Sequence, residues 1–182
     1  MIININKLKK LAPRSSKDIN AVASAFNKWL PLYQINTERR VDAFLAQALH
    51  ETGGFRWWRE LGSEKYFQKY EPNTSIGKRL GNIYPGDGYR YRGRGIFQLT
   101  GRYNYGRMGV ALNLDLLNHP DWASTIDVAI QIACQYWKDK NLNRFADIGD
   151  IKTITYRING GLNGFQDRLK YYTNLLKWAV WG

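Results

Sequence analysis

The stretch that decides the fold is Thr37–Gly54, which reads TERRVDAFLAQALHETGG. Its apolar side chains recur every three or four residues, the spacing of one face of an α-helix. They are Val41, Phe44, Leu45, Ala48 and Leu49. Thr37 is a residue type that caps helix N-termini, and the pair Gly53-Gly54 is typical of a helix end. The stretch therefore predicts a helix over 38–52 with one buried face.

The same periodicity extends outward in both directions. Residues 15–30 predict a helix that is capped by Ser15 or Ser16 and stopped by Pro31. Another helix follows Pro120, and a last helix ends the chain. The face that this last helix buries is expected to hold Leu169, Tyr172, Leu176, Ala179 and Val180.

The middle of the chain, residues 53–106, is rich in both glycine and aromatic residues. It holds 11 of the 17 glycines and 12 of the 26 Phe, Trp and Tyr residues. Glycine lets the backbone turn sharply or approach a ligand, and aromatic rings offer flat surfaces to sugars or bases. The composition indicates a binding cleft built on loops; the alternative is an irregular lobe with its own small aromatic core. The sequence predicts an all-α protein, or at most a mainly helical α+β protein. It leaves open one short hairpin, between Tyr84 and Phe97.

Charge and composition restrict the function. Lys+Arg 27 against Asp+Glu 15 gives a net charge of +12, which favours negatively charged partners: nucleic acid, an anionic cell wall or a membrane surface. No apolar run approaches the roughly 20 residues that a membrane-spanning helix needs. The start, MIININKLKK, has charges where a secretory signal needs apolar residues, so we expect folding in a cytoplasm.

Metal and thiol chemistry are poorly supported. One cysteine excludes an internal disulfide, and Cys134 lies in an apolar helical stripe where it packs as a small hydrophobe. The spacing of His50, His119 and Cys134 matches no short zinc motif. A site of histidines with a carboxylate is the one metal arrangement that spacing leaves open. We expect neither a metal nor a cofactor.

Glu51 is poorly placed for stability. It falls in the last turn of the 38–52 helix, where the negative end of the helix dipole disfavours a carboxylate. Its position at the edge of the apolar stripe also shields it from water. Both effects are expected to raise its pKa, as a general acid requires. His50 beside it either caps the helix end as a cation or takes part in the site.

A second carboxylate near Glu51 would complete the pair that glycosidases use. Glu60 lies nine residues on, beyond the Gly-Gly break, and Arg56 and Arg59 are expected to hold it ionised. The alternative is a surface glutamate that pairs with those arginines. Glu64 and Glu71 are reserve candidates in the same region.

Three blocks resemble the family 19 glycoside hydrolases, which include plant and bacterial chitinases and bacteriophage endolysins. They are Ala46–Phe55 (AQALHETGGF), Tyr91–Tyr105 (YRGRGIFQLTGRYNY) and Arg157–Gly164 (RINGGLNG), in the family's order. The resemblance implies a lysozyme-like two-lobe fold with a central substrate cleft in a single catalytic domain, residues 1–182. The helical lobe is expected at about 1–52 and 107–182, the loop-rich lobe at about 53–106, with no separate wall-binding domain.

The resemblance also implies roles for single residues. Glu51 matches the general acid, Glu60 the base of the endolysin-like members, and Thr100 the residue that helps hold the attacking water. The positions that match substrate-binding or acid-adjacent residues are Gln98, Tyr103, Asn104, Asn159 and Arg168. Asn163 stands where plant chitinases carry a further glutamate, so a charge network that includes that glutamate is not carried over. Arg92 and Arg94 are either loop anchors or sugar ligands.

The leading hypothesis is a monomeric endolysin, a lysozyme that cuts peptidoglycan between N-acetylmuramic acid and N-acetylglucosamine by inversion. It is expected to wait in the host cytoplasm and to reach the periplasm and wall once a holin opens the membrane; an anionic outer-membrane surface is a further partner. The first alternative is a chitinase. The second is a nucleic-acid binder that uses Tyr89, Tyr91 and Phe97 among arginines, and we expect no nucleic-acid partner because no such motif is present.

Overall fold

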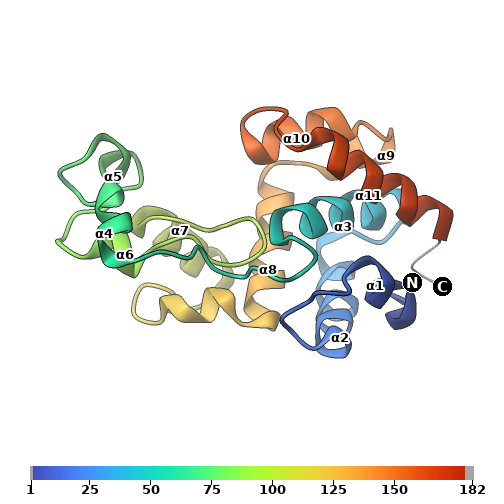
Figure 1. The fold of residues 1–182 in the computed structure, drawn as a ribbon, viewed down its shortest axis with the longest axis horizontal. Helices are drawn as coiled ribbons and strands as arrows, with labels where there is room; N and C mark the ends of the chain where they lie inside the picture. The colour runs from blue at the N-terminus through green and yellow to red at the C-terminus, as the bar shows by residue number, and fades with distance from the viewer. Residues whose placement is uncertain (1, 179–182) are drawn as a thin grey trace. The chain divides into compact units, whose positions relative to one another are not determined.

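The computed structural model describes residues 2–178, and these are mainly helical (Figure 1). The prediction of an all-α fold is confirmed. Within this range no strand forms, and the β contacts of the middle region are isolated bridges from Arg94 to Arg59 and to Leu99. None of the helices in residues 2–178 has both the length and the apolar character that crossing a lipid bilayer requires.

The chain divides into two compact units. Unit 1 consists of Met1–Trp57 and Ala133–Gly182, and unit 2 of Trp58–Ile132. These boundaries differ from the expected ones, because residues 107–132 belong to unit 2 and not to the helical lobe. The reason is a separate small core in unit 2, which is built largely from this segment. Its buried members are Tyr91, Tyr105, Met108, Leu116, Ala123 and Ile132.

Unit 1 is built around α3 (Glu38–Thr52), the helix that the stretch Thr37–Gly54 predicts. The Thr37 side chain caps it, and Gly53 ends it in a left-handed conformation (φ 59°). α3 packs against α11 (Phe165–Trp178), and the two helices lie side by side in Figure 1. The other helices of unit 1 are α1 (Ile5–Leu11), α2 (Ile19–Trp29), η1 (Pro31–Tyr33), α9 (Asn143–Asp147) and α10 (Ile151–Asn159), and α8 (Ile126–Asp139) carries residues of both units.

The core of unit 1 contains the predicted apolar faces. All five residues of the predicted apolar face of α3 are buried. Aromatic rings extend this core: Phe26 packs edge-on against Phe44, and Phe44 packs edge-on against Trp137. Cys134 is buried as well, and burial raises the pKa of its thiol far above the ordinary value. It is therefore a packing residue, as its sequence context predicts.

The start of α2 differs from the prediction. Its cap is Asp18, whose side chain accepts a hydrogen bond from the Asn20 amide. Ser15 and Ser16 lie before the helix. The Ser16 hydroxyl donates to the Arg56 carbonyl at 2.8 Å. The Ser15 hydroxyl donates to the Lys17 carbonyl at 2.9 Å and lies 3.4 Å from the Phe55 carbonyl. Their hydroxyls therefore tie the segment before α2 to the segment after α3, which local pattern does not show.

The end of α11 also differs. Leu175 is fully buried, whereas Leu176 is 48% exposed, so the expected stripe is rotated by one residue. Tyr172 is buried as predicted and Leu169 is half-buried. Ala179 and Val180 lie outside the described residues.

Unit 2 consists of short helices joined by loops. They are α4 (Glu64–Phe67), η2 (Gln68–Tyr70), α5 (Ser75–Arg79), α6 (Asp87–Arg90), α7 (Arg102–Leu112) and η3 (Pro120–Ser124). The hairpin between Tyr84 and Phe97 does not form. Asp87 accepts hydrogen bonds from the amides of Ile83 and Tyr84 and pairs with Arg102, so this segment turns into α6 instead of extending.

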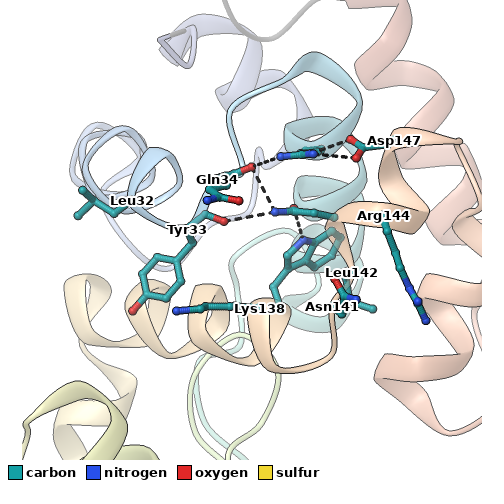
Figure 2. Close-up of a pocket in the computed structure, with 11 residues that line it drawn as sticks. Leu32, Tyr33, Gln34, Lys138, Asn141, Leu142, Arg144 and Asp147 are labelled. Atoms are coloured by element: carbon teal, nitrogen blue, oxygen red, sulfur yellow. Dashed lines mark hydrogen bonds and ion pairs between the residues drawn. The ribbon is translucent and has the colours of Figure 1, made fainter.

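A pocket in unit 1 lies where the α2–α3 connection meets the α8–α9 connection (Figure 2). The Asn143 amide nitrogen donates to two carbonyls of the α2–α3 connection, and its Oδ1 accepts from the indole of buried Trp137. Arg40 donates two hydrogen bonds to Asp147 and one to the Gln34 carbonyl. Because these polar groups satisfy one another, we interpret the pocket as a structural joint.

Candidate active site

Glu51 lies in the last turn of α3, and its carboxylate contacts a buried arginine from α11. Arg168 Nη2 donates to Glu51 Oε1 at 2.6 Å, and Arg168 Nη1 donates to Gln47 Oε1 at 2.6 Å. The Arg168 side chain is 1% exposed and that of Glu51 is 21% exposed. The structure therefore brings together Glu51 and Arg168, as the resemblance described in the sequence analysis implies.

Opposing electrostatic effects act on the Glu51 carboxylate. The end of the α3 dipole and partial burial disfavour its negative charge. The guanidinium of Arg168 stabilises that charge, an effect that the position of Glu51 in its helix does not reveal. Within residues 2–178, Glu51 is the one carboxylate that pairs with Arg168, and Arg168 Nε has no hydrogen-bond partner there. The buried cation therefore depends on a single anion.

Gln47 links this ion pair to α10 and was not singled out from the sequence. It is fully buried, and its Nε2 donates to Thr155 Oγ1 at 3.4 Å while its Oε1 accepts from Arg168. The spacing of four residues between Gln47 and Glu51 places both on one face of α3, which is the signal that could have found it.

His50 connects the end of α3 to the start of α11. Its Nδ1 lies 2.7 Å from Asp167 Oδ2. Gly164, with φ 72°, packs directly against the imidazole, so that a Cβ at this position would collide with the ring. His50 is therefore held by the first turn of α11 and the loop before it, and not by the carbonyls that end its own helix.

Asn159 is the last residue of α10 and is exposed. Gly160 follows with a left-handed conformation (φ 72°) and ends the helix. Within residues 2–178, the Asn159 carboxamide makes no hydrogen bond, so the structure does not link it to Glu51. Its substrate-binding role stays a prediction.

Glu60 is the central carboxylate of unit 2, and its two oxygens have different surroundings. Oε1 accepts from the Tyr70 hydroxyl at 2.9 Å, the Tyr66 hydroxyl at 3.2 Å and Lys69 Nζ at 3.5 Å. Oε2 accepts from the Gly93 amide at 3.3 Å. The expectation that Arg56 and Arg59 hold Glu60 is wrong, because in the described part of the chain no arginine bonds to it.

Gly93 brings two other predicted residues to Glu60. A Cβ on Gly93 would lie 2.6 Å from Gln98 Oε1, 3.2 Å from Glu60 Oε2 and 3.3 Å from Thr100 Oγ1. Three side-chain oxygens therefore converge on one backbone position that only glycine can occupy without a shift. The Glu60 amide also donates to the Gly93 carbonyl at 2.7 Å, which fixes the two segments to each other. Glu60, Gln98 and Thr100 form a single cluster.

The hydroxyl and amide groups of this cluster are oriented by the backbone. Thr100 Oγ1 donates to the Gln98 carbonyl at 2.9 Å, and Gln98 Nε2 donates to the Gly95 carbonyl at 2.9 Å. Gln98 has φ 51°, an uncommon conformation for a residue other than glycine. Asn104 Nδ2 donates to the Thr100 carbonyl at 2.8 Å, which places Asn104 behind Thr100 as a support.

Arg94 anchors this loop from inside unit 2. Its side chain is 2% exposed, pairs with Asp121 at 2.8 Å and donates to the Tyr105 hydroxyl at 2.9 Å. It also donates to the carbonyls of Arg90 and Arg92. Of the two roles open for Arg94, the structure supports the loop anchor. Arg92 donates to the Tyr89 carbonyl and stacks over that ring.

The remaining candidates lie in other surroundings. Tyr103 is 65% exposed and lines an apolar groove on α7 with Val110 and Leu117. Glu71 accepts from the amides of Gly86 and Gly88, so it supports a loop. Glu64 is an exposed residue in the first turn of α4. The two reserve glutamates are therefore not part of the Glu60 cluster.

Within residues 2–178, no group of three His, Cys, Asp or Glu side chains is arranged to hold a metal ion. The contacts of Glu51 and Glu60 give each carboxylate a cationic partner, and Glu60 has neutral donors as well.

A family model described as chitinase class I, glycoside hydrolase family 19, matches residues 17–152. The chain belongs to this family. A protein of Haemophilus influenzae named as containing a glycosyl hydrolase family 19 domain is 37% identical over 157 residues, covering 73% of this chain and 76% of that protein. An endochitinase of Arabidopsis thaliana is 37% identical over 148 residues, covering 77% of this chain and 48% of its own length.

The solved structures of family 19 chitinases share the fold. Chitinase C of Streptomyces griseus matches with a TM-score of 0.75 at 23% identity, covering 96% of this chain and 91% of that one. A class IV chitinase of Zea mays matches with a TM-score of 0.66, covering 94% of this chain and 89% of that one. The family 19 chain spans about half the length of the plant endochitinases it matches. It is a glycoside hydrolase with a lysozyme-like helical fold.

Proposed function

We propose that this family 19 hydrolase is an endolysin that cuts peptidoglycan between N-acetylmuramic acid and N-acetylglucosamine. The observation that supports it most is the environment of Glu60. Its Oε1 is held by three donors, while its Oε2 faces the neutral side chains of Gln98 and Thr100. An ionised carboxylate beside neutral hydrogen-bonding groups is what a base that activates water needs.

In the proposed reaction Glu60 Oε2 accepts a proton from a water molecule as the water oxygen attacks the anomeric carbon. The bond between that carbon and the bridging oxygen breaks, and Glu51 donates its proton to the bridging oxygen. The anomeric carbon inverts because water arrives opposite the leaving group. Glu60 then carries a proton and Glu51 is ionised, and exchange with solvent restores both.

Thr100 is suited to orient that water. Because its hydroxyl hydrogen is donated to the Gln98 carbonyl, Oγ1 presents its lone pairs to the cluster. Oγ1 then accepts one hydrogen of the water while Glu60 Oε2 accepts the other.

Arg168 fits the second half of the cycle. It stabilises the Glu51 anion that proton donation creates, at an N–O distance of 2.6 Å. The first half of the cycle requires a Glu51 that carries a proton. The mechanism further requires the two carboxylates to stand roughly 6.5–9.5 Å apart in the working enzyme.

The choice of peptidoglycan rests on charge. The net charge of +12 suits an anionic wall and an anionic outer-membrane surface, whereas chitin is uncharged. Chitin is the second candidate, because the plant relatives at 37–38% identity are named endochitinases. Under the endolysin proposal the enzyme is a monomer that is made in the host cytoplasm and reaches the wall when a holin opens the membrane.

The test is digestion of purified peptidoglycan and of soluble N-acetylglucosamine oligomers, followed by mass spectrometry of the products. The proposal predicts wall fragments that end in reducing N-acetylmuramic acid, and faster turnover of the wall than of the oligomers. Faster cleavage of the oligomers with no release from the wall would show a chitinase. Outer-membrane-stripped Gram-negative cells should lose turbidity with wild-type enzyme and keep it with the Glu51→Gln variant.

A further inference from the structure

Three side chains next to Glu60 share one face of a short helical segment. Tyr66, Lys69 and Tyr70 are spaced i, i+3, i+4 across α4 and η2, which places them on the same side. Ser63 caps the start of this segment by accepting from the Tyr66 amide. Phe67, which is 1% exposed, packs on the rings of both tyrosines and of Tyr89.

All three side chains converge on one oxygen of Glu60. The two tyrosine hydroxyls donate to Oε1 at 2.9 and 3.2 Å, and Lys69 Nζ approaches it at 3.5 Å. Lys69 is itself held over the tyrosine rings, 3.5 Å from the centroid of Tyr66 and 4.6 Å from that of Tyr70. Since a carboxylate oxygen has two lone pairs, three donors saturate Oε1.

The other carboxylate oxygen, Oε2, accepts fewer hydrogen bonds. Oε2 accepts a single long hydrogen bond, from the Gly93 amide, and it lies beside Gln98 and Thr100. The four contacts together hold the plane of the carboxylate, so the position that Oε2 occupies keeps its direction toward Gln98 and Thr100. Oε2 is the oxygen with free capacity for a proton.

We propose that Tyr66, Lys69 and Tyr70 are positioning residues that clamp Glu60 through Oε1, stabilise its negative charge and leave Oε2 as the oxygen that takes the proton from water. This rests on the proposed role of Glu60 as the base. None of the three touches the reacting atoms, so each acts through Glu60.

Charge and burial are consistent with this clamp. Burial opposes the charge of Lys69, but hydrogen bonds to both tyrosines and the charge of Glu60 raise its pKa, so it stays a cation at neutral pH. Burial and the hydrogen bond to Glu60 raise the pKa of Tyr70, so its hydroxyl stays a donor. Among the described residues, the titratable groups that bond to Glu60 are these three. From the 93–100 loop the Gly93 amide donates to it, and the side chains of Gln98 and Thr100 lie close to the same glycine.

The experiment measures the pH dependence of kcat/KM for Lys69→Met and Tyr70→Phe on soluble peptidoglycan strands or N-acetylglucosamine oligomers. The low-pH limb reports ionisation of the base in free enzyme. Loss of the Lys69 charge should move this limb to higher pH by about 0.5–1 unit, the effect of a partly solvated charge at this distance. Tyr70→Phe should move it in the same direction by less, and should lower kcat about tenfold with little change in KM. Lys69→Arg should restore the wild-type limb.

The chain offers matched controls. Lys65→Met removes a lysine from the same helix and Tyr89→Phe removes a hydroxyl from a ring on the same Phe67, and neither side chain bonds to Glu60. Both controls should keep the wild-type limb. A Lys69→Met enzyme that loses activity with an unmoved limb, or a control that moves it equally, would overturn the clamp. Full activity in Glu60→Gln would instead remove the base role itself, so the two failures are distinguishable.

Discussion

The two units control a carboxylate by different means. In unit 1, Glu51 stands on a long helix and contacts one fully buried cation, Arg168, from another long helix. In unit 2, Glu60 stands on a loop and receives four contacts from hydroxyls, a half-exposed ammonium and a backbone amide. One buried charge therefore holds the first carboxylate, whereas one partly exposed charge and three neutral donors hold the second.

The two units are therefore expected to differ in how well they tolerate the loss of a partner of the carboxylate. A buried arginine that loses its anion leaves a charge without compensation, which is costly in a core. A carboxylate with four donors loses one of them at a smaller cost, because the others and nearby water remain. Unit 1 should therefore respond to substitution in an all-or-none way, and unit 2 in graded steps.

The largest effect expected is loss of turnover in Glu51→Gln and Glu60→Gln. Each should lower kcat about 100- to 10,000-fold, since each removes one proton-transfer group. The comparison predicts that only Glu51→Gln also lowers stability, by about 1–3 kcal/mol, because Arg168 loses its anion. Urea unfolding and initial rates on peptidoglycan measure both. Glu38→Gln, at the exposed start of α3, is the control: it should keep the wild-type rate and lose less than about 1 kcal/mol, the effect of a charge on the helix dipole.

The next-largest effect is a difference in stability between variants of the two cations, Arg168 and Lys69. Arg168→Met should lower the free energy of unfolding by about 2–4 kcal/mol, because Gln47 and Glu51 both lose a donor inside the α3–α11 contact. Lys69→Met should lower it by less than about 1 kcal/mol, since Lys69 is 36% exposed and water replaces it. Equal losses in the two variants, measured by urea unfolding, would contradict the comparison.

A third prediction concerns the close approach at Gly93. A methyl group in Gly93→Ala would press on the oxygens of Glu60, Gln98 and Thr100, so kcat should fall about 100-fold while the helical circular dichroism is kept. Gly161→Ala is the control, because a Cβ there meets no atom within 4 Å. If Gly93→Ala retained wild-type kcat, the arrangement of the three oxygens would not matter for the reaction.

The smallest effect concerns acid stability of unit 2. Burial alone would raise the pKa of Asp87, but Arg102 and the amides of Tyr84 and Ile83 lower it overall. A lowered folded-state pKa contributes stability above the unfolded value, about 4, and this stability is lost as pH falls through the folded-state value. Asp87→Asn should therefore cost about 2 kcal/mol at pH 7 and less at pH 3, which lies below the unfolded value. An equal loss in the free energy of unfolding at both pH values, measured by urea unfolding, would contradict this prediction.

Periodicity predicts unit 1 well because its helices are long and one-sided. The apolar face of α3, its Thr37 cap and its Gly53 end are all found where the sequence indicates. What periodicity does not give is the partner across a helix–helix contact: Arg168 was reached only through resemblance to the family. Its hydrogen bond to Gln47 was not foreseen at all, because the two residues are 121 positions apart.

Unit 2 was predicted only as a region. Glycine and aromatic content located a loop-built site, but the ligands of Glu60 were assigned to neighbouring arginines. Lys69 and the two tyrosines were missed because α4 and η2 are too short for a periodic signal, and Asp87 turned a candidate hairpin into a helix through contacts with Arg102. Short elements held by side-chain hydrogen bonds leave little trace in a sequence.

The central claim of the proposed mechanism is that Glu51 acts as the acid and Glu60 as the base, with water as the nucleophile. Proton NMR of the product, recorded within the first minutes of hydrolysis of a soluble β-linked substrate, tests it most directly. The mechanism predicts that the newly formed reducing end appears as the α-anomer and only later equilibrates. First appearance of the β-anomer would show retention and a covalent intermediate, and would contradict the roles assigned to both carboxylates.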